Sequence, residues 1–336
     1  MDQIKTAVAQ FLQNPQMQSI IQSTEVERKK IVRDGFILLA AGLVPVLLLA
    51  YLFWIPEHKL SLENIEGLGK LAVVIFVLAM FYIQRKAKKS NTLHNDVISV
   101  LAREIDSGLS YTYTVSERPN WIANRAIIPD YDDIVITDNI RHVSQNQHHG
   151  LTFKITSSGY KIVAGKGSGK SRTIVMKAFV TEIAFENPRH FATEQILIKG
   201  ETPGFFSDLF SHRHAVHLES NEFEKHFDVS CANQTLAREI LNPYMMHVLM
   251  EFTAKQRKQF RYDFLFTENK LYVTRHAKAY APNSAQFGGF SPFVPYTSPK
   301  IYEDFYQEFI HFQKLIADLE VYYYDYGTLE KQSTLQ

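Results

Sequence analysis

Cysteine is almost absent from this chain, because Cys231 is the only one among 336 residues. An intrachain disulfide is therefore excluded, and with it a fold that depends on disulfide bridges. A reducing compartment such as the cytosol is permitted. A lone cysteine without an evident histidine partner is rarely a nucleophile, so we interpret Cys231 as a small buried or half-buried residue.

Net charge is nearly absent as well. The 36 Lys and Arg residues are balanced by 35 Asp and Glu residues, which leaves a formal net charge of +1. This balance gives no general argument for binding nucleic acid or an acidic partner. We therefore expect no nucleic-acid partner.

Catalytic and metal-binding motifs are also missing. The sequence has no Ser-His-Asp nucleophile elbow, no zinc motif and no dinucleotide-binding fingerprint. The nearest approach to a metal cluster is His212, His214 and His217, but on a strand only the first two would share a face. We therefore expect no metal, no cofactor and no catalytic residue, and we favour a role other than catalysis.

Apolar residues, in contrast, are abundant and gather in two runs near the N-terminus. Gly35–Trp54 is a stretch of twenty residues without a charge, which is enough to span the hydrocarbon core of a bilayer, about 30 Å thick. The second run, Ile65–Ile83, is weaker because Glu66 and Lys70 lie near its start. We predict a transmembrane hairpin with spans at 35–54 and 65–83.

Basic residues flank this hairpin on the side away from its short connection, residues 55–64. They are Arg28, Lys29, Lys30, Arg33, Arg85, Lys86, Lys88 and Lys89. The positive-inside rule places such flanks in the cytoplasm. We therefore predict a multi-pass protein of the plasma (inner) membrane, with both termini and residues 90–336 cytoplasmic. The eight side chains either only fix this topology or also bind anionic lipid headgroups, and the two roles are compatible.

The expected domains are an N-terminal cytosolic segment at 1–34, the hairpin at 35–83, a cytosolic domain at 90–325 and a tail at 326–336. Within the cytosolic domain, strand-like runs come first and helices are interspersed late. The expected strands are 111–115, 133–137, 151–156, 160–163, 173–185, 194–198, 260–266 and 271–274, and the expected helices are 91–106, 237–241, one that begins at Asn242-Pro243, and 300–322. This order predicts an α+β fold with a mixed, mainly antiparallel sheet.

A Gly-rich stretch, Val163–Val175 (VAGKGSGKSRTIV), fits a loose form of the phosphate-binding loop. A nucleotide site would use Gly169, Lys170 and Ser171, and it would need a helix directly afterwards whose N-terminus meets the phosphates. Residues 173–185 are instead rich in β-branched and aromatic residues, which favours a strand. We predict a hairpin with this stretch at its tip. A membrane-tethered nucleotide hydrolase remains the alternative function.

The segment 216–252 reads VHLESNEFEKHFDVSCANQTLAREILNPYMMHVLMEF. Its distinctive positions are Leu218-Glu219, Phe223-Glu224-Lys225, Phe227, Val229, Gln234, Ala237-Arg238, Ile240-Leu241, Pro243 and Met246. This block resembles an uncharacterised bacterial family, a domain of unknown function with two N-terminal transmembrane helices and a cytosolic domain. Asn233 departs from the family pattern, which has an acid there. The resemblance implies this architecture and assigns no catalytic residue.

The segment 280–299, YAPNSAQFGGFSPFVPYTSP, is too rich in Pro and Gly to form a regular element. Its aromatic residues are Tyr280, Phe287, Phe290, Phe293 and Tyr296. If exposed, these rings would form a protein-binding surface; if folded back, they would cap the core of the domain, and the sequence leaves both possibilities open. Taken together, the patterns predict a membrane-anchored cytosolic binding or scaffolding module with an unknown protein partner.

Overall fold

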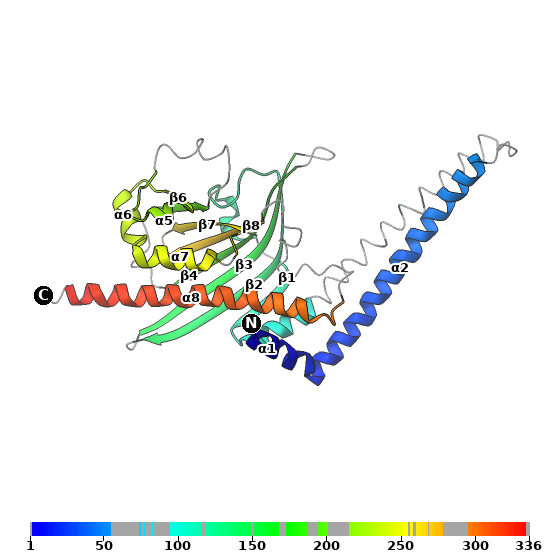
Figure 1. The fold of residues 1–336 in the computed structure, drawn as a ribbon, viewed down its shortest axis with the longest axis horizontal. Coiled ribbons are helices and arrows are strands. Elements are labelled where there is room, and N and C mark those ends of the chain that lie inside the picture. The colour runs from blue at the N-terminus through cyan, green and yellow to red at the C-terminus, as the bar shows by residue number, and fades with distance from the viewer. Residues whose placement is uncertain are drawn as a thin grey trace. The chain divides into compact units, whose positions relative to one another are not determined.

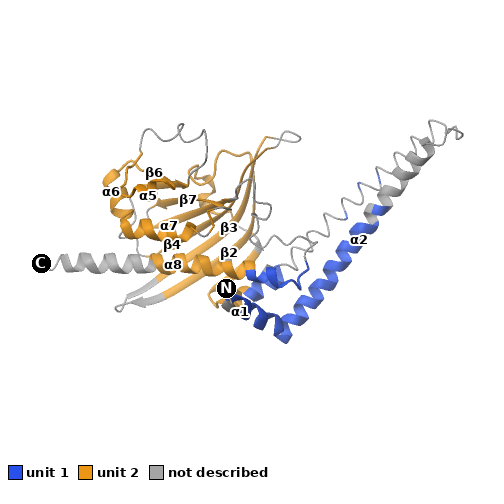
Figure 2. Cartoon of the chain, viewed as in Figure 1, with its two compact units in different colours: residues 1–101, 290–303 blue, residues 102–289, 304–336 orange. Residues whose placement is uncertain are grey.

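In the computed structural model, the chain forms two compact units (Figure 2). Unit 1 comprises residues 1–101 and 290–303, and unit 2 comprises residues 102–289 and 304–336. The structure describes residues 2–54, 74, 77, 82, 95–115, 118–148, 151–167, 173–186, 194–200, 215–254, 256–257, 260–267, 269–277 and 295–333.

Unit 1 is helical and is assembled from distant parts of the chain. It consists of helix α1 (Asp2–Gln13), helix α2 (Pro15–Trp54), a further helical segment at 95–101 and residues 295–303. Its buried apolar residues include Val8, Phe11, Met17, Ile21, Val97, Ile98, Leu101, Tyr296 and Tyr302. These side chains come from all four segments, so the unit is complete only when the late segment is in place.

A buried ion pair fixes the late segment of unit 1. Arg28 Nη2 lies 2.6 Å from Glu25 Oε1, and the second carboxylate oxygen of Glu25 accepts the backbone N–H of Tyr296 at 3.1 Å. The hydroxyl of Tyr302 donates to the Tyr296 carbonyl at 2.7 Å. Because a buried carboxylate must be fully hydrogen-bonded to be tolerated, Glu25 holds Tyr296 at a defined position.

Unit 2 is built on an eight-stranded antiparallel sheet with the strand order β1-β2-β3-β4-β8-β7-β5-β6 (Figure 1). The strands are β1 (Leu109–Thr114), β2 (Asp133–His148), β3 (Leu151–Lys166), β4 (Thr173–Phe185), β5 (Ile196–Gly200), β6 (Phe227–Ser230), β7 (Phe260–Thr267) and β8 (Lys270–Ala277). Strands β2, β3 and β4 follow one another as hairpins, and β7 and β8 form another.

Helices cover one face of this sheet. They are α5 (Asn221–Glu224), α6 (Gln234–Ile240), α7 (Pro243–Ala254) and α8 (Pro299–Ser333). The side chain of Asn233 caps α6 by accepting the N–H of Leu236 at 3.1 Å, and that of Asn242 accepts the N–H of Met245 at 3.0 Å at the start of α7. The main core lies between the sheet and helices α6, α7 and α8. Alternating side chains of the central strands create a smaller core on the opposite face, which the short helix η1 (Asn120–Ala123) and the residues after it cover.

Strand β2 contributes to both cores because its register shifts in the middle. Between Thr137 and Ile140, two residues of β2 oppose one residue of β3. Such a bulge reverses the face to which the even-numbered side chains point. Ile134 and Ile136 accordingly pack in the smaller core, whereas Ile140 packs in the main core. Asp138, at the bulge, has φ of 54°, a left-handed conformation that Asp and Asn adopt more readily than other side chains.

The expected α+β fold is confirmed, and so are both expected hairpins. The hairpin around the Gly-rich stretch pairs β3 with β4, and the second pairs β7 with β8. Strands β2 and β3 are each 16 residues long, whereas the sequence predicted short strands at 133–137, 151–156 and 160–163. The polar residues that interrupt their alternation concealed this length. Strand β6 and helix α1 were not predicted.

The first expected transmembrane span, 35–54, lies in helix α2, although most of its side chains lie outside what the structure describes. Of the second, 65–83, only Val74, Val77 and Tyr82 are described. In the part of the chain that the structure describes, no helix is both long and apolar enough to cross a membrane. The basic residues Arg85, Lys86, Lys88 and Lys89 also lie outside that part.

The space beside Gly159 provides a test of the main core. A Cβ atom built there would lie 2.4 Å from Cζ of Phe179, whose ring is itself buried against Phe312. We expect Gly159→Ala to lower the free energy of unfolding by about 1–3 kcal/mol through overpacking. Ser158→Ala, on the neighbouring and less crowded position, is the control and should change it by less than about 0.5 kcal/mol. Equal effects in urea unfolding would contradict this packing.

Candidate functional site

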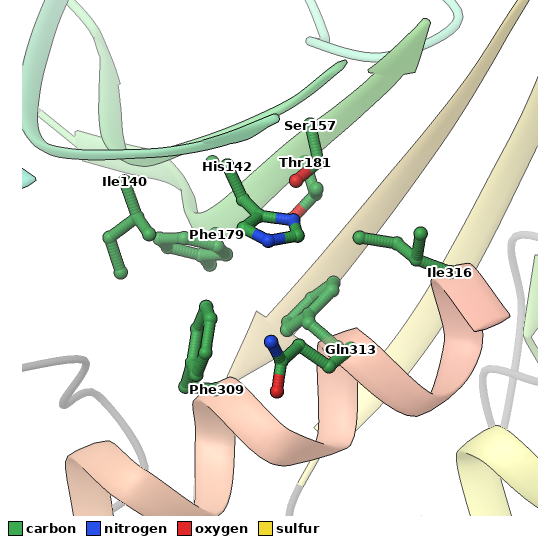
Figure 3. Close-up of a pocket in the computed structure, with 10 residues that line it drawn as sticks. Ile140, His142, Ser157, Phe179, Thr181, Phe309, Gln313 and Ile316 are labelled. Carbon is green, nitrogen blue, oxygen red and sulfur yellow. The ribbon is translucent and has the colours of Figure 1, made fainter. Parts of the chain in front are cut away.

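Polar side chains meet beneath helix α8, inside the main core. A small cavity of about 30 Å³ lies between this helix and strands β2, β3 and β4 (Figure 3). Its lining residues are Ile140, His142, Ser157, Gly159, Phe179, Thr181, Phe309, Phe312, Gln313 and Ile316. Most of this lining is apolar, so the few polar atoms that face the cavity stand out. We refer to it as the inner cavity.

His142 is held at the inner cavity by a carboxylate and a helix side chain. Its Nε2 lies 3.2 Å from Asp106 Oδ2, and the amide of Gln313, on α8, donates to the same oxygen at 3.0 Å. The other oxygen of Asp106 accepts the backbone N–H of Gly108 at 2.7 Å. The ring of Phe309 contacts the imidazole edge-on, with the ring centroids 5.9 Å apart. Asp106 therefore orients His142 and ties it to α8.

Two polar atoms at the inner cavity have no hydrogen-bond partner among the described residues. They are Nδ1 of His142 and the hydroxyl oxygen of Thr181. His142 is only 8% exposed and Thr181 only 4%, so bulk water does not satisfy either atom. A buried polar atom without a partner costs free energy, and such atoms in a native fold call for an explanation.

An open pocket adjoins the inner cavity. It has a volume of about 430 Å³ and shares His142, Gln313 and Ile316 with the inner cavity. The rest of its wall comes from the turn at Asp106–Gly108, from residues 143–145 of β2 and from Ala317. None of the described residues that line it is Lys or Arg. We refer to it as the outer pocket.

A second polar cluster lies at the bulge of β2. Asp138 accepts hydrogen bonds from the hydroxyls of Tyr111 and Thr137, and Lys161 Nζ lies 3.8 Å from one of its oxygens. Burial raises the pKa of the Asp138 carboxyl, and this effect exceeds the opposing effects of Tyr111 and Lys161. The cluster therefore holds a carboxyl group at the point where β2 changes faces.

Few side chains among the described residues are arranged in a way that would support catalysis. The pair of His142 and Asp106 resembles a base with its orienting acid, but no described hydroxyl is hydrogen-bonded to the free nitrogen of His142. The inner cavity has room for about one water molecule and therefore none for a substrate. Among the described residues, no three His, Cys, Asp or Glu side chains lie close enough together to hold a metal ion.

The strands on either side of the Gly-rich stretch, β3 and β4, pair with each other as in a hairpin. Gly169, Lys170 and Ser171 lie outside the described residues, but strand β4 begins at Thr173, where a nucleotide site would need a helix. The backbone N–H of Gly167 is already bound by the carboxylate of Asp132 at 2.7 Å. An acid at this position would repel a phosphate, so the residues described on either side of the loop do not favour the nucleotide-hydrolase alternative.

Two other predicted site residues are buried in unit 1. Tyr296 is only 2% exposed and forms part of the core, so for this residue the packing role applies and a surface for a partner does not. Tyr280, Phe287, Phe290 and Phe293 lie outside the described residues, and their role stays a prediction. Arg28 is 8% exposed and paired with Glu25, which corrects its assignment to a lipid headgroup. Its neighbours Lys29, Lys30 and Arg33 are exposed.

Comparison with known proteins finds one family that matches part of the chain. Residues 170–321 match the model of a family described as a protein of unknown function, DUF3137. The match covers a little under half of the chain and includes Thr181 and Gln313, whereas Asp106 and His142 precede it. It supports the expected resemblance to an uncharacterised domain family; the bacterial origin and the two membrane helices stay predictions. No curated protein and no solved structure matches the chain.

The inner cavity was not predicted from the sequence. Its polar residues come from β2, β3, β4 and α8, and the hydrogen bond from Gln313 to Asp106 joins residues 207 positions apart. A weak signal was present in β4, where Thr181 interrupts the apolar alternation of Phe179 and Ile183. A polar residue in the core-facing register of a strand is such a signal.

The raised pKa of Asp138 predicts a pH-dependent stability. Because the folded-state pKa is raised from 3.8, the contribution of this group to stability is present below the unfolded-state pKa and is lost as pH rises through the folded one. Asp138→Asn stays neutral and tolerates the left-handed backbone. We expect the free energy of unfolding of the variant, relative to the wild type, to increase from acid to neutral pH.

Asp130→Asn is the matched control for this measurement. Hydrogen bonding to Lys166, foremost, lowers the pKa of the exposed Asp130, so its stabilising effect is present only above its unfolded-state pKa and is lost in acid. The relative stability of this variant should therefore change with pH in the opposite direction. A change of the same sign in both variants, measured by urea unfolding across this pH range, would refute the assignment.

The hairpin interpretation makes a prediction for Lys170. If this residue lies at an exposed tip, Lys170→Ala should change the free energy of unfolding by less than about 0.5 kcal/mol and should leave the protein without specific nucleotide binding, as in the wild type. Equilibrium binding of labelled ATP and GTP to both proteins tests this. Saturable binding by the wild type that Lys170→Ala abolishes would restore the nucleotide interpretation.

Proposed function

We propose that this chain is a membrane-anchored binding or scaffolding module. In this proposal, residues 35–54 and 65–83 form a hairpin in the plasma membrane, and the α+β unit is held at its cytoplasmic face. The main support for the proposal is one hydrogen bond, in which the hydroxyl of Tyr82 donates to Asp34 Oδ2 at 2.8 Å. Asp34 immediately precedes the first apolar run, and Tyr82 stands at the end of the second. A two-span hairpin requires these two ends to meet on one side of the bilayer.

Exposed apolar side chains support the same arrangement. Within the two runs, Phe36 is 62% exposed, Ile37 58%, and Val74 and Val77 54% each. Large apolar side chains in contact with water are unfavourable, and their free energy falls when hydrocarbon covers them. Tyr82 at the end of the second run suits the interface, where the aromatic ring meets apolar chains and the hydroxyl meets polar groups.

The basic residues of α2 support an orientation and a lipid contact. Lys29, Lys30 and Arg33 are exposed, and they lie within two turns before the exposed Phe36 and Ile37. This order matches the transition from headgroups to acyl chains, where each exposed cation near an anionic leaflet contributes about 1 kcal/mol of attraction. In the proposal these three residues contact the inner leaflet, and the N-terminus and residues 90–336 are cytoplasmic.

A binding role suits unit 2 better than a catalytic one. The pair of His142 and Asp106 comes nearest to a catalytic arrangement among the described residues, yet its free nitrogen faces a cavity of about 30 Å³. The partner that the module would bind is an unidentified protein. An activity that uses the Gly-rich stretch has no comparable observation in its favour.

Cysteine labelling tests the topology. In the proposal, a cysteine at Ser61 lies outside the cell and one at Ser333 lies inside. The only native thiol, Cys231, is 3% exposed and its pKa is raised by burial, so it should contribute little background. In intact cells an impermeant maleimide should label Ser61→Cys, and it should label Ser333→Cys only after the membrane is permeabilised. Labelling of Ser333→Cys in intact cells would overturn the orientation, and recovery of the protein in the soluble fraction would overturn the anchor.

A further inference from the structure

We infer that the inner cavity and the outer pocket together form a binding site for a small, neutral, polyhydroxylated molecule, with one hydroxyl of the ligand seated between His142 and Thr181. This inference concerns unit 2 alone, so it stands or falls independently of the membrane anchor.

The first step is the hydrogen-bonding state of His142. Its Nε2 faces the carboxylate of Asp106 at 3.2 Å, and a carboxylate only accepts hydrogen bonds. The proton of the neutral imidazole is therefore assigned to Nε2, and Nδ1 keeps a lone pair. The site thus presents one acceptor, Nδ1 of His142, and one group that both donates and accepts, the hydroxyl of Thr181. A ligand hydroxyl that donates to the former and accepts from the latter satisfies both.

The second step is the size of the inner cavity and of the outer pocket. The inner cavity of about 30 Å³ has about the volume of one water molecule in the liquid, so only a terminal group of a ligand can enter it. The outer pocket of about 430 Å³ falls in the usual range for small-molecule sites. Gln313 and Ile316 border both. A ligand would therefore insert a single hydroxyl and leave its body in the outer pocket.

The third step is charge. The described lining of the outer pocket carries the carboxylate of Asp106 and no Lys or Arg side chain, so a phosphate or carboxylate ligand would be repelled. A cation is also disfavoured at the inner end. Arg275 already places a positive charge near this end, with its guanidinium carbon 5.7 Å from the ring centroid of Phe179, which lines the inner cavity, so a cationic ligand would be repelled by it. A neutral ligand remains.

The fourth step is the polar character of the outer pocket. Its described wall offers the side chains of Ser107 and Gln145 and the amide of Gln313. Several hydrogen-bonding groups without a balancing charge suit a molecule with several hydroxyls, such as a polyol or a monosaccharide. A ligand hydroxyl, which would take the place of a single water molecule in the inner cavity, is then the partner of the two unsatisfied buried atoms.

Binding of simple probes tests the inference. The purified full-length protein, in glycerol-free buffer, is titrated with glycerol and with myo-inositol, and binding is followed by saturation-transfer NMR of the ligand. We expect saturable binding of at least one of these neutral polyols. Glycerol 3-phosphate, the anionic counterpart, should bind at least about tenfold more weakly because it meets Asp106. Absence of saturable binding by both neutral probes would overturn the inference, and so would preferential binding of the phosphate.

Two substitutions then locate the site. Thr181→Val removes the hydroxyl at constant shape, and His142→Gln keeps an amide that can reach Asp106 but removes the acceptor at Nδ1. Each should raise the dissociation constant of the neutral probe about threefold to tenfold, as expected for the loss of one hydrogen bond between neutral groups. Thr112→Val, on an exposed position of β1, is the matched control and should leave it unchanged.

The outcome stays decisive if a variant does not fold. Thr181→Ser retains the hydroxyl and loses only a methyl group, so it should bind the probe within about twofold of the wild type if the hydroxyl is the recognition element. Circular dichroism verifies the fold of each protein. Unchanged binding in both Thr181→Val and His142→Gln would show that the probe does not contact this pair. Loss of binding in folded Thr181→Ser would show that the hydroxyl is not the recognition element.

Discussion

The structure of unit 2 depends on one constraint: strand β2 has to serve two cores that lie on opposite faces of the sheet. A regular strand cannot do this with residues of the same parity, because its side chains alternate strictly between the faces. The bulge at Asp138 removes the conflict by adding a residue, after which Ile140 and His142 face α8. Without it, His142 would point toward the smaller core. The position of His142 beneath α8 therefore depends on the register shift between β2 and β3.

The residue at the bulge has to meet two demands at once. It must adopt a positive φ, and it must satisfy its own polar group in a buried place. Asp138 meets the first because short polar side chains tolerate this backbone. It meets the second through Tyr111, on β1, and Thr137. The hydrogen bond from Tyr111 also connects the edge strand β1 to the bulge. One carboxyl group therefore stabilises both the bulge and the edge of the sheet.

Much of the fold could be predicted from the sequence, because local patterns determine it. The composition of residues 173–185 predicted strand β4, and with it the hairpin that replaces a phosphate-binding loop. The pair Asn242-Pro243 predicted the start of α7, where the side chain of Asn242 accepts the N–H of Met245. In each case the signal lies within one element and reports burial or capping directly.

The candidate site could not be predicted in the same way. The bulge was not predicted, since Ile134–Thr137 is a run of β-branched residues typical of a regular strand, and the shift becomes apparent only from the pairing with β3. The residues beneath α8 come from segments that the sheet brings together, so no spacing in the sequence relates Asp106 to His142 or to Gln313. The sequence could not decide between the two roles left open for Tyr296 for a related reason: its backbone N–H is bound by Glu25, which lies 271 residues away in the chain.

The order in which the parts of the chain appear has a consequence for its biosynthesis. Unit 1 needs Tyr296 and Tyr302 for its core, and unit 2 needs Phe312, Ile316 and Leu319 to cover the sheet. All of these stand near the C-terminal end of the sequence. A nascent chain can therefore close neither core until helix α8 has left the ribosome, although most strands are made long before. A prematurely terminated chain would expose both apolar interiors at once, which is the feature that chaperones and proteases recognise.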